Sequence, residues 1–529
     1  MPSQPQDHVH RLIHTMTRAE KRYFKVYCAR HIPNGQGIHT ELFDAIGGMA
    51  QYDEQALRRQ FPGAAFMRRF PITKRRLYEA LLNSLDAFHA ENSAEDKLRR
   101  LLHHVEVLYS KALYADASKV LGSARSLARA NDKQALLLQV TEWERRIMER
   151  GNYADVTDAD LRDRAEKVDG LMLEWQEMEQ LWRIKSSIFR LIYRSGQAPG
   201  PREMAAVEIL SQEPLLAKNA ALRSIRARFL HHHVRSALAY ARNDLKACEK
   251  ELTACASLIQ AEEAQFRSEP DLSLGVMGNL AHVRMRLGRH EEALDGFREF
   301  RKLPLMLSTA PSPDLQMKLF VMGGSLELSV LCTKGEFIKA TERLADLEEG
   351  LAQYGPRAST VRRAELELQA AYACFGAGQH ERALRWCNRL LNEPGIEAHQ
   401  ELHTLGRMLN VAVLMELGKT ALLDYVARNT RRFHKQHGST FAMEALLLGH
   451  AHAMAKTKDV PTRYALWSGL AGQIAALAKD VREATVLDHI DLLSWAQGHA
   501  DDRPFHELVK GRWATKAMPG KPARSKHAA

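Results

Sequence analysis

The sequence predicts an all-α protein built mainly from stacked antiparallel helix pairs. Its composition favours helices, because aromatic residues make up only 7 % of the 529 residues and β-branched residues are sparse beside Ala, Leu, Arg and Glu. Residues suited to tight turns between helices recur at positions 112, 151, 196, 243, 288, 335, 378 and 418, which are 39 to 47 residues apart. Each interval has room for two helices of about 15–20 residues, and stacked pairs bury apolar faces that one pair leaves exposed.

The clearest unit of this pattern follows Leu280. Gly288 accepts the backbone geometry of a tight turn between two helices. Ala281 and Ala293, on either side of the turn, let the two helices approach closely, and Phe297 fills the space beside them. The positions that we assign to turns and to packing between helices, in this unit and in the others, are Ala112, Tyr114, Ala117, Gly151, Tyr153, Asn243, Ala281, Gly288, Ala293, Phe297, Gly335, Phe337, Ala340, Ala371, Gly378, Ala383 and Gly418.

This order of small residue, turn glycine, second small residue and bulky residue resembles the tetratricopeptide motif. The resemblance implies a right-handed superhelix of antiparallel helix pairs over residues 93–507. The period of about 39–47 residues exceeds the roughly 34 residues of a standard tetratricopeptide repeat, so the helices or loops must be longer. HEAT or armadillo stacking, whose period is closer, is the competing arrangement.

Residues 1–92 lack the pattern and are predicted to form a small module of short helices. A helix-turn-helix is one possible arrangement of these helices. Thr17 and Glu20 have the spacing of a capping box at the start of one of these helices. The stretch from Met16 to Phe24 is similar to the opening of a family of uncharacterised bacterial repeat proteins, in which Ser/Thr-x-x-Glu-Lys-Arg-x-Phe precedes a helical repeat region. That resemblance implies an architecture and no activity.

The positive charge of the chain is concentrated at its two ends. The formal net charge is +11, from 75 Lys and Arg against 64 Asp and Glu. Residues 1–90 carry an excess of +5 and residues 508–529 an excess of +6, which leaves the long middle balanced. A uniformly basic nucleic-acid clamp is therefore excluded. Residues 508–529 have few apolar groups to bury, so we expect a disordered basic tail.

The sequence indicates a cytoplasmic protein. Its 6 cysteines form no C-x-x-C pair, and they are too few for a disulfide scaffold. The first residues lack the apolar segment of a secretory signal, and no run approaches the ~18 apolar residues of a membrane span. We therefore expect no association with a membrane.

No motif for catalysis, a cofactor or a metal survives inspection. Gly418-Lys419-Thr420 resembles the end of a phosphate-binding loop, but that loop needs Gly at the position of Val413. His399 and His403 have the spacing of a zinc-protease helix, but the required Glu is replaced by Gln400. The sequence therefore predicts a protein that is not an enzyme and has no catalytic, cofactor-binding or metal-ligating residues.

The expected function is that of a non-catalytic scaffold that binds a protein or peptide in the concave groove of the superhelix. By resemblance, the first helix of each pair lines this groove; an alternative is that the chain's own segments fill it. The groove residues expected in this way are His233, Tyr240, His282, Arg286, Ser325, Ser329, Glu365 and Tyr372.

The alternative function is a nucleic-acid-binding regulator with the repeats as its sensor. Clustered cations on one face of the N-terminal module would contact phosphates. An ordinary solvated helix face is the competing interpretation. The residues concerned are Arg18, Arg22, Lys25, Lys74, Arg75 and Arg76.

Overall fold

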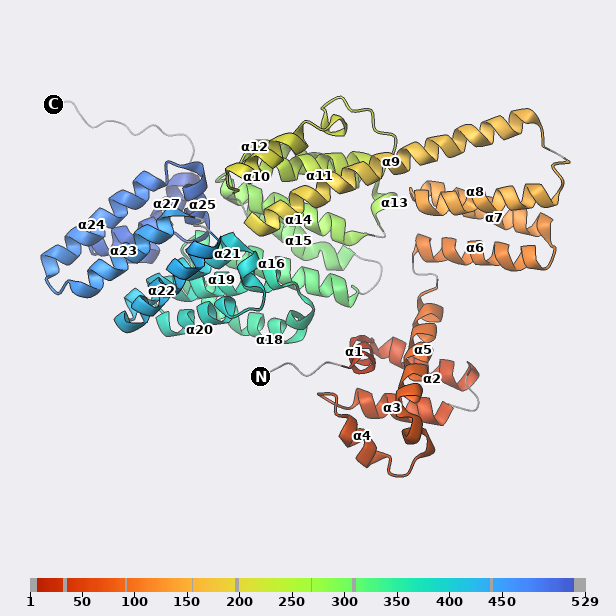
Figure 1. Cartoon of the computed structure of the whole chain (residues 1–529), viewed down its shortest axis with the longest axis horizontal. Coiled ribbons are helices and arrows are strands. Elements are labelled where there is room, and N and C mark those ends of the chain that lie inside the picture. Colours follow the sequence, from red (N-terminus) through yellow and green to blue (C-terminus); the bar gives the residue numbers. More distant parts are fainter. Residues whose placement is uncertain are drawn as a thin grey trace. The chain divides into compact units, whose positions relative to one another are not determined.

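In the part of the chain that it describes, the computed structural model consists of helices, turns and loops, with no strand (Figure 1). The all-α prediction is therefore confirmed. The structure describes residues 7–31, 36–90, 93–154, 156–195, 199–267, 269–306, 311–437 and 441–517. The chain divides into two compact units, Met1–Met172 and Leu173–Ala529. This division falls inside a long helix and not at residue 92, where the sequence analysis placed a boundary.

The N-terminal module lies within the first unit and has its own apolar core. Its helices are α1 (His8–Thr15), α2 (Arg18–His31), α3 (Gln36–Gly47), α4 (Glu54–Gln60), the short 3-10 helix η1 (Ala65–Arg69) and α5 (Phe70–His89). Large residues such as Phe24, Leu42 and Leu77 are buried together in this core, whose buried members lie between residues 9 and 81. The helix-turn-helix interpretation of the module stays a prediction.

The predicted capping box is formed at the start of α2. The amide of Thr17 donates to a carboxylate oxygen of Glu20 over 2.6 Å, and the amide of Glu20 donates to the Thr17 hydroxyl over 3.2 Å. Glu20 also accepts a hydrogen bond of 2.6 Å from His89 at the end of α5. The capping box thus satisfies two helix-start amides, one through the Thr17 hydroxyl and one through the Glu20 carboxylate, and that carboxylate also links two helices of the module.

Three helices of similar length follow in the first unit. They are α6 (Ala94–Ser110), α7 (Tyr114–Ala130) and α8 (Gln134–Arg150), and they share a core in which Ala117 and Leu121 are buried. Ala112 and Asp132 adopt the left-handed backbone conformation in the turns between them, with φ of 58° and 52°. The turn at Asp132 was not predicted, because it lies between the expected turns at positions 112 and 151 and is not marked by a glycine.

Helix α9 (Asp158–Ser195) breaks the predicted regularity, since a single helix of 38 residues occupies the space assigned to a pair (Figure 1). The turn expected at Gly151 is displaced, because Gly151 has an ordinary negative φ and Asn152 and Tyr153 take the left-handed conformation instead. The turn expected at position 196 lies outside the described residues. No proline or glycine pair interrupts α9, which explains why it continues.

The second unit contains the remaining helices. They are α10 (Pro201–Ser211), η2 (Pro214–Leu216), α11 (Ile225–Ala241), α12 (Leu245–Ala261), α13 (Glu263–Phe266), α14 (Pro270–Arg286), α15 (His290–Met306), α16 (Pro313–Thr333), α17 (Phe337–Glu342), α18 (Leu344–Tyr354), η3 (Gly355–Arg357), α19 (Thr360–Gly376), α20 (His380–Leu391), η4 (Ile396–Ala398), α21 (Gln400–Glu416), α22 (Thr420–His437), α23 (Ala442–Lys456), α24 (Val460–Leu477), α25 (Val481–His489), α26 (Leu492–Asp501) and α27 (Phe505–Ala517).

Tight turns join successive helices of this unit in a repeated way. The left-handed conformation occurs at Asn243, Gly288, Gly335, Gly378 and Gly418, all of which are predicted turn positions. The amide after each of these residues donates to the carbonyl five positions earlier, as in the Schellman ending of a helix. Small side chains are fully buried where the helices cross, among them Ala281, Ala293, Ala340, Ala371 and Ala383.

Helices pack against one another mainly in chain order. α11 packs on α12, α12 on α14, α14 on α15 and α16, α16 on α19, α19 on α20 and α21, and α21 on α23. The last helix departs from this order, because α27 contacts α16 as well as its neighbour α26. The end of the chain therefore folds back onto the middle of the second unit.

The predicted disordered tail is wrong for residues 508–517, which belong to α27. Val509 is buried, and the Trp513 ring lies 5.7 Å from the His290 ring, with the Lys334 ammonium 5.2 Å from its centre. Arg512 forms an ion pair with Asp491. The few apolar groups of this segment are thus sufficient to hold it, because a preformed surface receives them. Residues 518–529 lie outside the described residues.

Among the described residues, one helix is long and apolar enough to span a membrane, and it is α16. Core helices have the same composition. Leu315, Val321, Leu326, Leu328 and Cys332 of α16 are buried, and the helix packs against α14, α15, α17, α18, α19 and α27.

Candidate functional site

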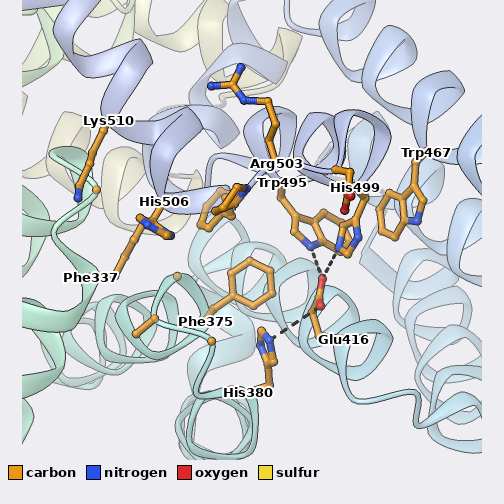
Figure 2. Close-up of a pocket in the computed structure, with 18 of the residues that line it drawn as sticks. Phe337, Phe375, His380, Glu416, Trp467, Trp495, His499, Arg503, His506 and Lys510 are labelled. Carbon is orange, nitrogen blue, oxygen red and sulfur yellow. Dashed lines mark hydrogen bonds and ion pairs between the residues drawn. The ribbon is translucent and has the colours of Figure 1, made fainter.

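A groove of about 970 Å³ opens beside the turns that precede α17 and α20 (Figure 2). The starts of α17, α20 and α27 and the end of α21 form part of its lining, together with side chains of α24 and α26. Several helix pairs and the returning chain end thus supply one hollow.

Aromatic rings form the wall of this groove. The Phe337 ring stacks on the Phe505 ring at 5.4 Å between centres, and Phe375 meets Trp495 edge to face at 5.9 Å. Gly376 makes the approach of Phe337 possible, because a Cβ there would lie only 2.3 Å from the Phe337 ring. The wall is therefore built by close packing of α17, α19, α26 and α27, and not by mobile surface side chains.

The Glu416 carboxylate points towards these rings (Figure 2). Its Oε1 atom accepts hydrogen bonds of 2.6 Å from Trp495 Nε1 and from His499 Nε2, and its Oε2 atom lies 3.9 Å from His380 Nε2. Burial raises the pKa of Glu416, but the hydrogen bonds from His499 and Trp495 and the nearby imidazoles lower that pKa by more, so the net shift is downward. The carboxylate is thus ionised, and its hydrogen bonds fix the orientation of the Trp495 and His499 rings. The His499 ring stacks on Trp467 at 4.1 Å.

Burial lowers the pKa of His380, and Glu416 opposes this shift only partly. A neutral imidazole, an ionised carboxylate and an indole do not form a nucleophile with its base. Among the described residues no group of three or more His, Cys, Asp or Glu side chains could hold a metal ion. The predicted absence of catalytic, cofactor and metal residues stays a prediction.

Three exposed cations border the aromatic wall without a matching anion. Arg463, Arg503 and Lys510 line the groove, and none of them forms an ion pair with a carboxylate in the described part of the chain. Their neighbour Lys339, in contrast, lies 3.1 Å from Glu336. Asp502 is an exposed carboxylate of the same lining. The groove therefore carries an excess of one positive charge next to apolar rings, with Lys339, Arg463, Arg503 and Lys510 against Glu336, Glu416 and Asp502.

All eight predicted groove residues come together, but in a different place. They line two adjoining hollows of about 300 Å³ and 120 Å³. Helices α11, α14, α16 and α19, which are the first helices of their pairs, supply two of these residues each. Asp488 and His489 of α25 line the same hollows, so the chain's own C-terminal part covers this surface. The binding of a partner in this groove stays a prediction.

The cations predicted to contact nucleic acid are not equivalent. Lys74 is half-buried with its ammonium 2.7 Å from the buried Asp7 carboxylate, so it holds α5 to the start of α1 and is not presented to a phosphate. Lys25 and Arg75 are exposed but lie 2.8 Å from Asp44 and 2.9 Å from Glu79. The other three are exposed and lack a carboxylate partner among the described residues; they are Arg18, Arg22 and Arg76.

The sequence analysis missed most of the groove. Phe337 was assigned to packing, which it does, but Phe375, Glu416 and Arg503 were not singled out. A usable signal was the position of aromatic residues close to the turn glycines, since Phe337 follows Gly335 by two residues. No sequence pattern indicated the contribution of α26 and α27, because it depends on where the C-terminal helices pack against the rest of the second unit.

No protein-family model matches the chain, and a search of the curated proteins also gave no match.

Proposed function

We propose that the protein is a non-catalytic scaffold that binds a segment of a partner protein carrying both apolar and acidic side chains. The groove between α17, α24 and α27 is the binding surface. The observation that carries the proposal is the combination of an aromatic wall with three exposed, unmatched cations in a hollow of about 970 Å³. Aromatic residues and Arg are the residue types that supply most of the binding energy at protein interfaces.

Apolar residues at the rim support a peptide and not a small ion as the ligand. Ile338 is 69 % exposed, Val460 is 61 % exposed and Tyr464 is 44 % exposed, and all three line the groove. Large apolar side chains gathered beside a hollow typically mark a surface that a partner covers. The cations would then pair with carboxylates of the bound segment and set its direction.

We also propose how the helix pairs of the second unit are arranged. We infer that the pairs from α11/α12 to α21/α22 stack in register as a right-handed superhelix resembling tetratricopeptide repeats. The chain-order packing and the repeated Schellman turns support this arrangement. A crystal structure of the full chain would give the handedness, and a left-handed or unstacked arrangement of these pairs would contradict it.

The experiment uses the full chain and an array of short random peptides, from which the best binders are measured by fluorescence anisotropy. We expect selected peptides to combine Asp or Glu with Leu, Ile, Phe or Trp. The double variant Arg503→Glu/Lys510→Glu should weaken binding about tenfold or more, because it places like charges against the peptide. Lys246→Glu/Lys250→Glu is the matched control, since both residues are exposed on α12 and also lack a carboxylate partner among the described residues.

Equal weakening by the groove variant and by the control would show that net charge and not the groove determines binding. Selection of basic or purely polar peptides would contradict the proposed chemistry.

We infer that this scaffold works in the reducing environment of the cytoplasm. The 6 cysteines are all buried free thiols. Burial raises the pKa of each thiol, for example that of Cys28 to about 11 and that of Cys248 to about 12, which keeps them protonated and unreactive. Detection of a disulfide in the protein purified from its host would contradict this localisation.

A further inference from the structure

The two adjoining hollows of the second unit have polar walls. Polar side chains reach them from four first helices, including His233 of α11, His282 of α14, Ser329 of α16 and Gln369 of α19. Leu252, Met322 and Leu326 supply apolar surface to the larger hollow. The hollows share six lining residues, so they lie directly beside one another.

Three buried polar atoms of these walls lack a hydrogen-bond partner among the described residues. They are Nη1 of Arg286, Oε1 of Gln369 and Nδ1 of His233. The Arg286 side chain is only 8 % exposed, and its Nε and Nη2 atoms donate to Asp488 over 3.0 Å and 2.6 Å. Gln369 uses only its amide nitrogen, which donates to Ser325 over 3.1 Å. Buried polar groups normally have partners, so these atoms indicate an occupant.

Water alone is a poor match for the larger hollow. This hollow measures about 300 Å³, which is room enough for a small organic molecule. Part of its wall is apolar and offers water no hydrogen bond. A molecule with both polar ends and an apolar part would satisfy both kinds of surface.

The charges on the walls come in both signs. Arg286 pairs with Asp488, and Arg362 lies 2.9 Å from Glu365. His282 and His489 add no charge, since burial, reinforced by the Arg286 cation, lowers the pKa of His282 to about 3 and that of His489 to about 4. The walls therefore offer a guanidinium for an anion and carboxylates for a cation.

We propose that these hollows bind a small zwitterion, namely an α-amino acid or a dipeptide. Its carboxylate accepts hydrogen bonds from Nη1 of Arg286, and its ammonium group donates to Oε1 of Gln369 and faces Glu365. Its side chain lies against Leu252 and Leu326. Such a site lies apart from the aromatic groove, so it gives the scaffold a second, small-molecule ligand.

The test is isothermal titration calorimetry of the full chain with the common α-amino acids and with dipeptides of them. We expect at least one zwitterion to bind. Its N-acetylated amide, which keeps the side chain but loses both charges, should bind at least about tenfold more weakly. Binding of free nucleosides or sugars in the absence of zwitterion binding would overturn the proposal.

Two variants locate the site. Ser329→Met adds volume where the two hollows meet and should abolish binding, while Ser468→Met places the same change at an exposed position of α24 and should leave binding unchanged. Gln369→Leu removes the unpartnered carbonyl and should weaken binding about tenfold. If the amino acids and dipeptides give no heat and no change in melting temperature, the hollows hold only water and the proposal fails. Zwitterion binding that survives both Ser329→Met and Gln369→Leu would place the ligand elsewhere and would also overturn it.

Discussion

In the N-terminal module, the buried carboxylate of Asp7 lies against Lys74, whereas in the second unit the buried carboxylate of Glu367 leaves one oxygen without a hydrogen bond among the described residues. The Lys74 ammonium also donates to Tyr52 over 3.3 Å, so this ion pair is fully used inside the module. Glu367 has only Arg389, at 3.3 Å and half-exposed. The Asp7 carboxylate is thus fully paired, whereas the Glu367 carboxylate is not.

The surface cations differ in their surroundings. In the module, Lys25 and Arg75 lie against carboxylates of the module itself, while Arg18, Arg22 and Arg76 are exposed without such a partner among the described residues. Around the groove, Arg463, Arg503 and Lys510 also lack such partners in the described part of the chain, but they line a hollow beside aromatic rings. Aromatic residues together with Arg are typical of binding surfaces, so the groove, and not the unpaired cations alone, marks the proposed binding part of the chain.

The largest effect on stability is expected when the ion pair between Asp7 and Lys74 in the module is removed. Lys74→Met should destabilise the module by about 3 kcal/mol, because it leaves Asp7 buried without its cation. Burial raises the pKa of Asp7, but the bonds from Lys74 and from the start of α1 lower it by more, so the wild-type carboxylate is ionised. Hydrogen exchange of amides in α1 and α5 measures the loss. Arg76→Met, at an exposed and unpaired position, is the control; equal protection in both variants would show that the ion pair contributes nothing.

A smaller effect of opposite sign is expected at Glu367. Burial raises the pKa of Glu367 to about 7, above the value of about 4.3 of an unfolded chain. Between these values the unfolded chain has already lost the proton that the folded chain retains, so stability falls as pH rises towards 7. Glu367→Gln removes this penalty. It should therefore stabilise the second unit by about 2 kcal/mol at pH 8 and by much less at pH 4.

Denaturant unfolding of the wild type and of Glu367→Gln at these two pH values measures the effect. Arg389→Gln provides a comparison, because it removes the partner and should increase the penalty. A gain from Glu367→Gln that does not change with pH would show that the carboxyl group is not the cause.

The capping box of the module gives a third, weaker effect. Thr17→Ala should cost about 1 kcal/mol, since it removes the hydroxyl that accepts from the amide of Glu20. Burial raises the pKa of Glu20, but the bonds from Thr17 and His89 lower it by more. The stability that Glu20 contributes is thus present above the unfolded pKa of about 4.3 and is lost as the pH falls through its lower folded value. Hydrogen exchange of the first amides of α2 measures both effects. If the cost of Thr17→Ala is the same at pH 7 and pH 3, Glu20 does not take part.

The comparison also shows how far sequence reasoning reaches. The capping box at Thr17 and the turns at Gly288 and Gly378 were predictable, because they depend on residues close together in the chain. The 38-residue helix α9 was not predictable in this way. The repeat spacing predicts a turn within this segment, but the segment contains no proline that would end a helix. The groove could not be predicted for a different reason. Its wall depends on the contact between Phe337 and Phe505, which are far apart in the sequence, and no local sequence pattern indicates that contact.

The smallest effect on stability is expected at the groove itself, and it separates the two regions most clearly. Arg503→Gln/Lys510→Gln should change the free energy of unfolding by less than about 0.5 kcal/mol, because both side chains are exposed and make no ion pair in the described part of the chain. The same double variant should nevertheless weaken the binding of acidic peptides. Lys25→Gln is the matched change in the module; it should cost a few tenths of a kcal/mol through loss of the Asp44 pair at 2.8 Å and leave peptide affinity unchanged. Thermal melts and anisotropy titrations of the same preparations measure both quantities. A clear loss of stability in the groove variant would mean that these cations hold the fold together, and the contrast between the two regions would then not identify the binding surface.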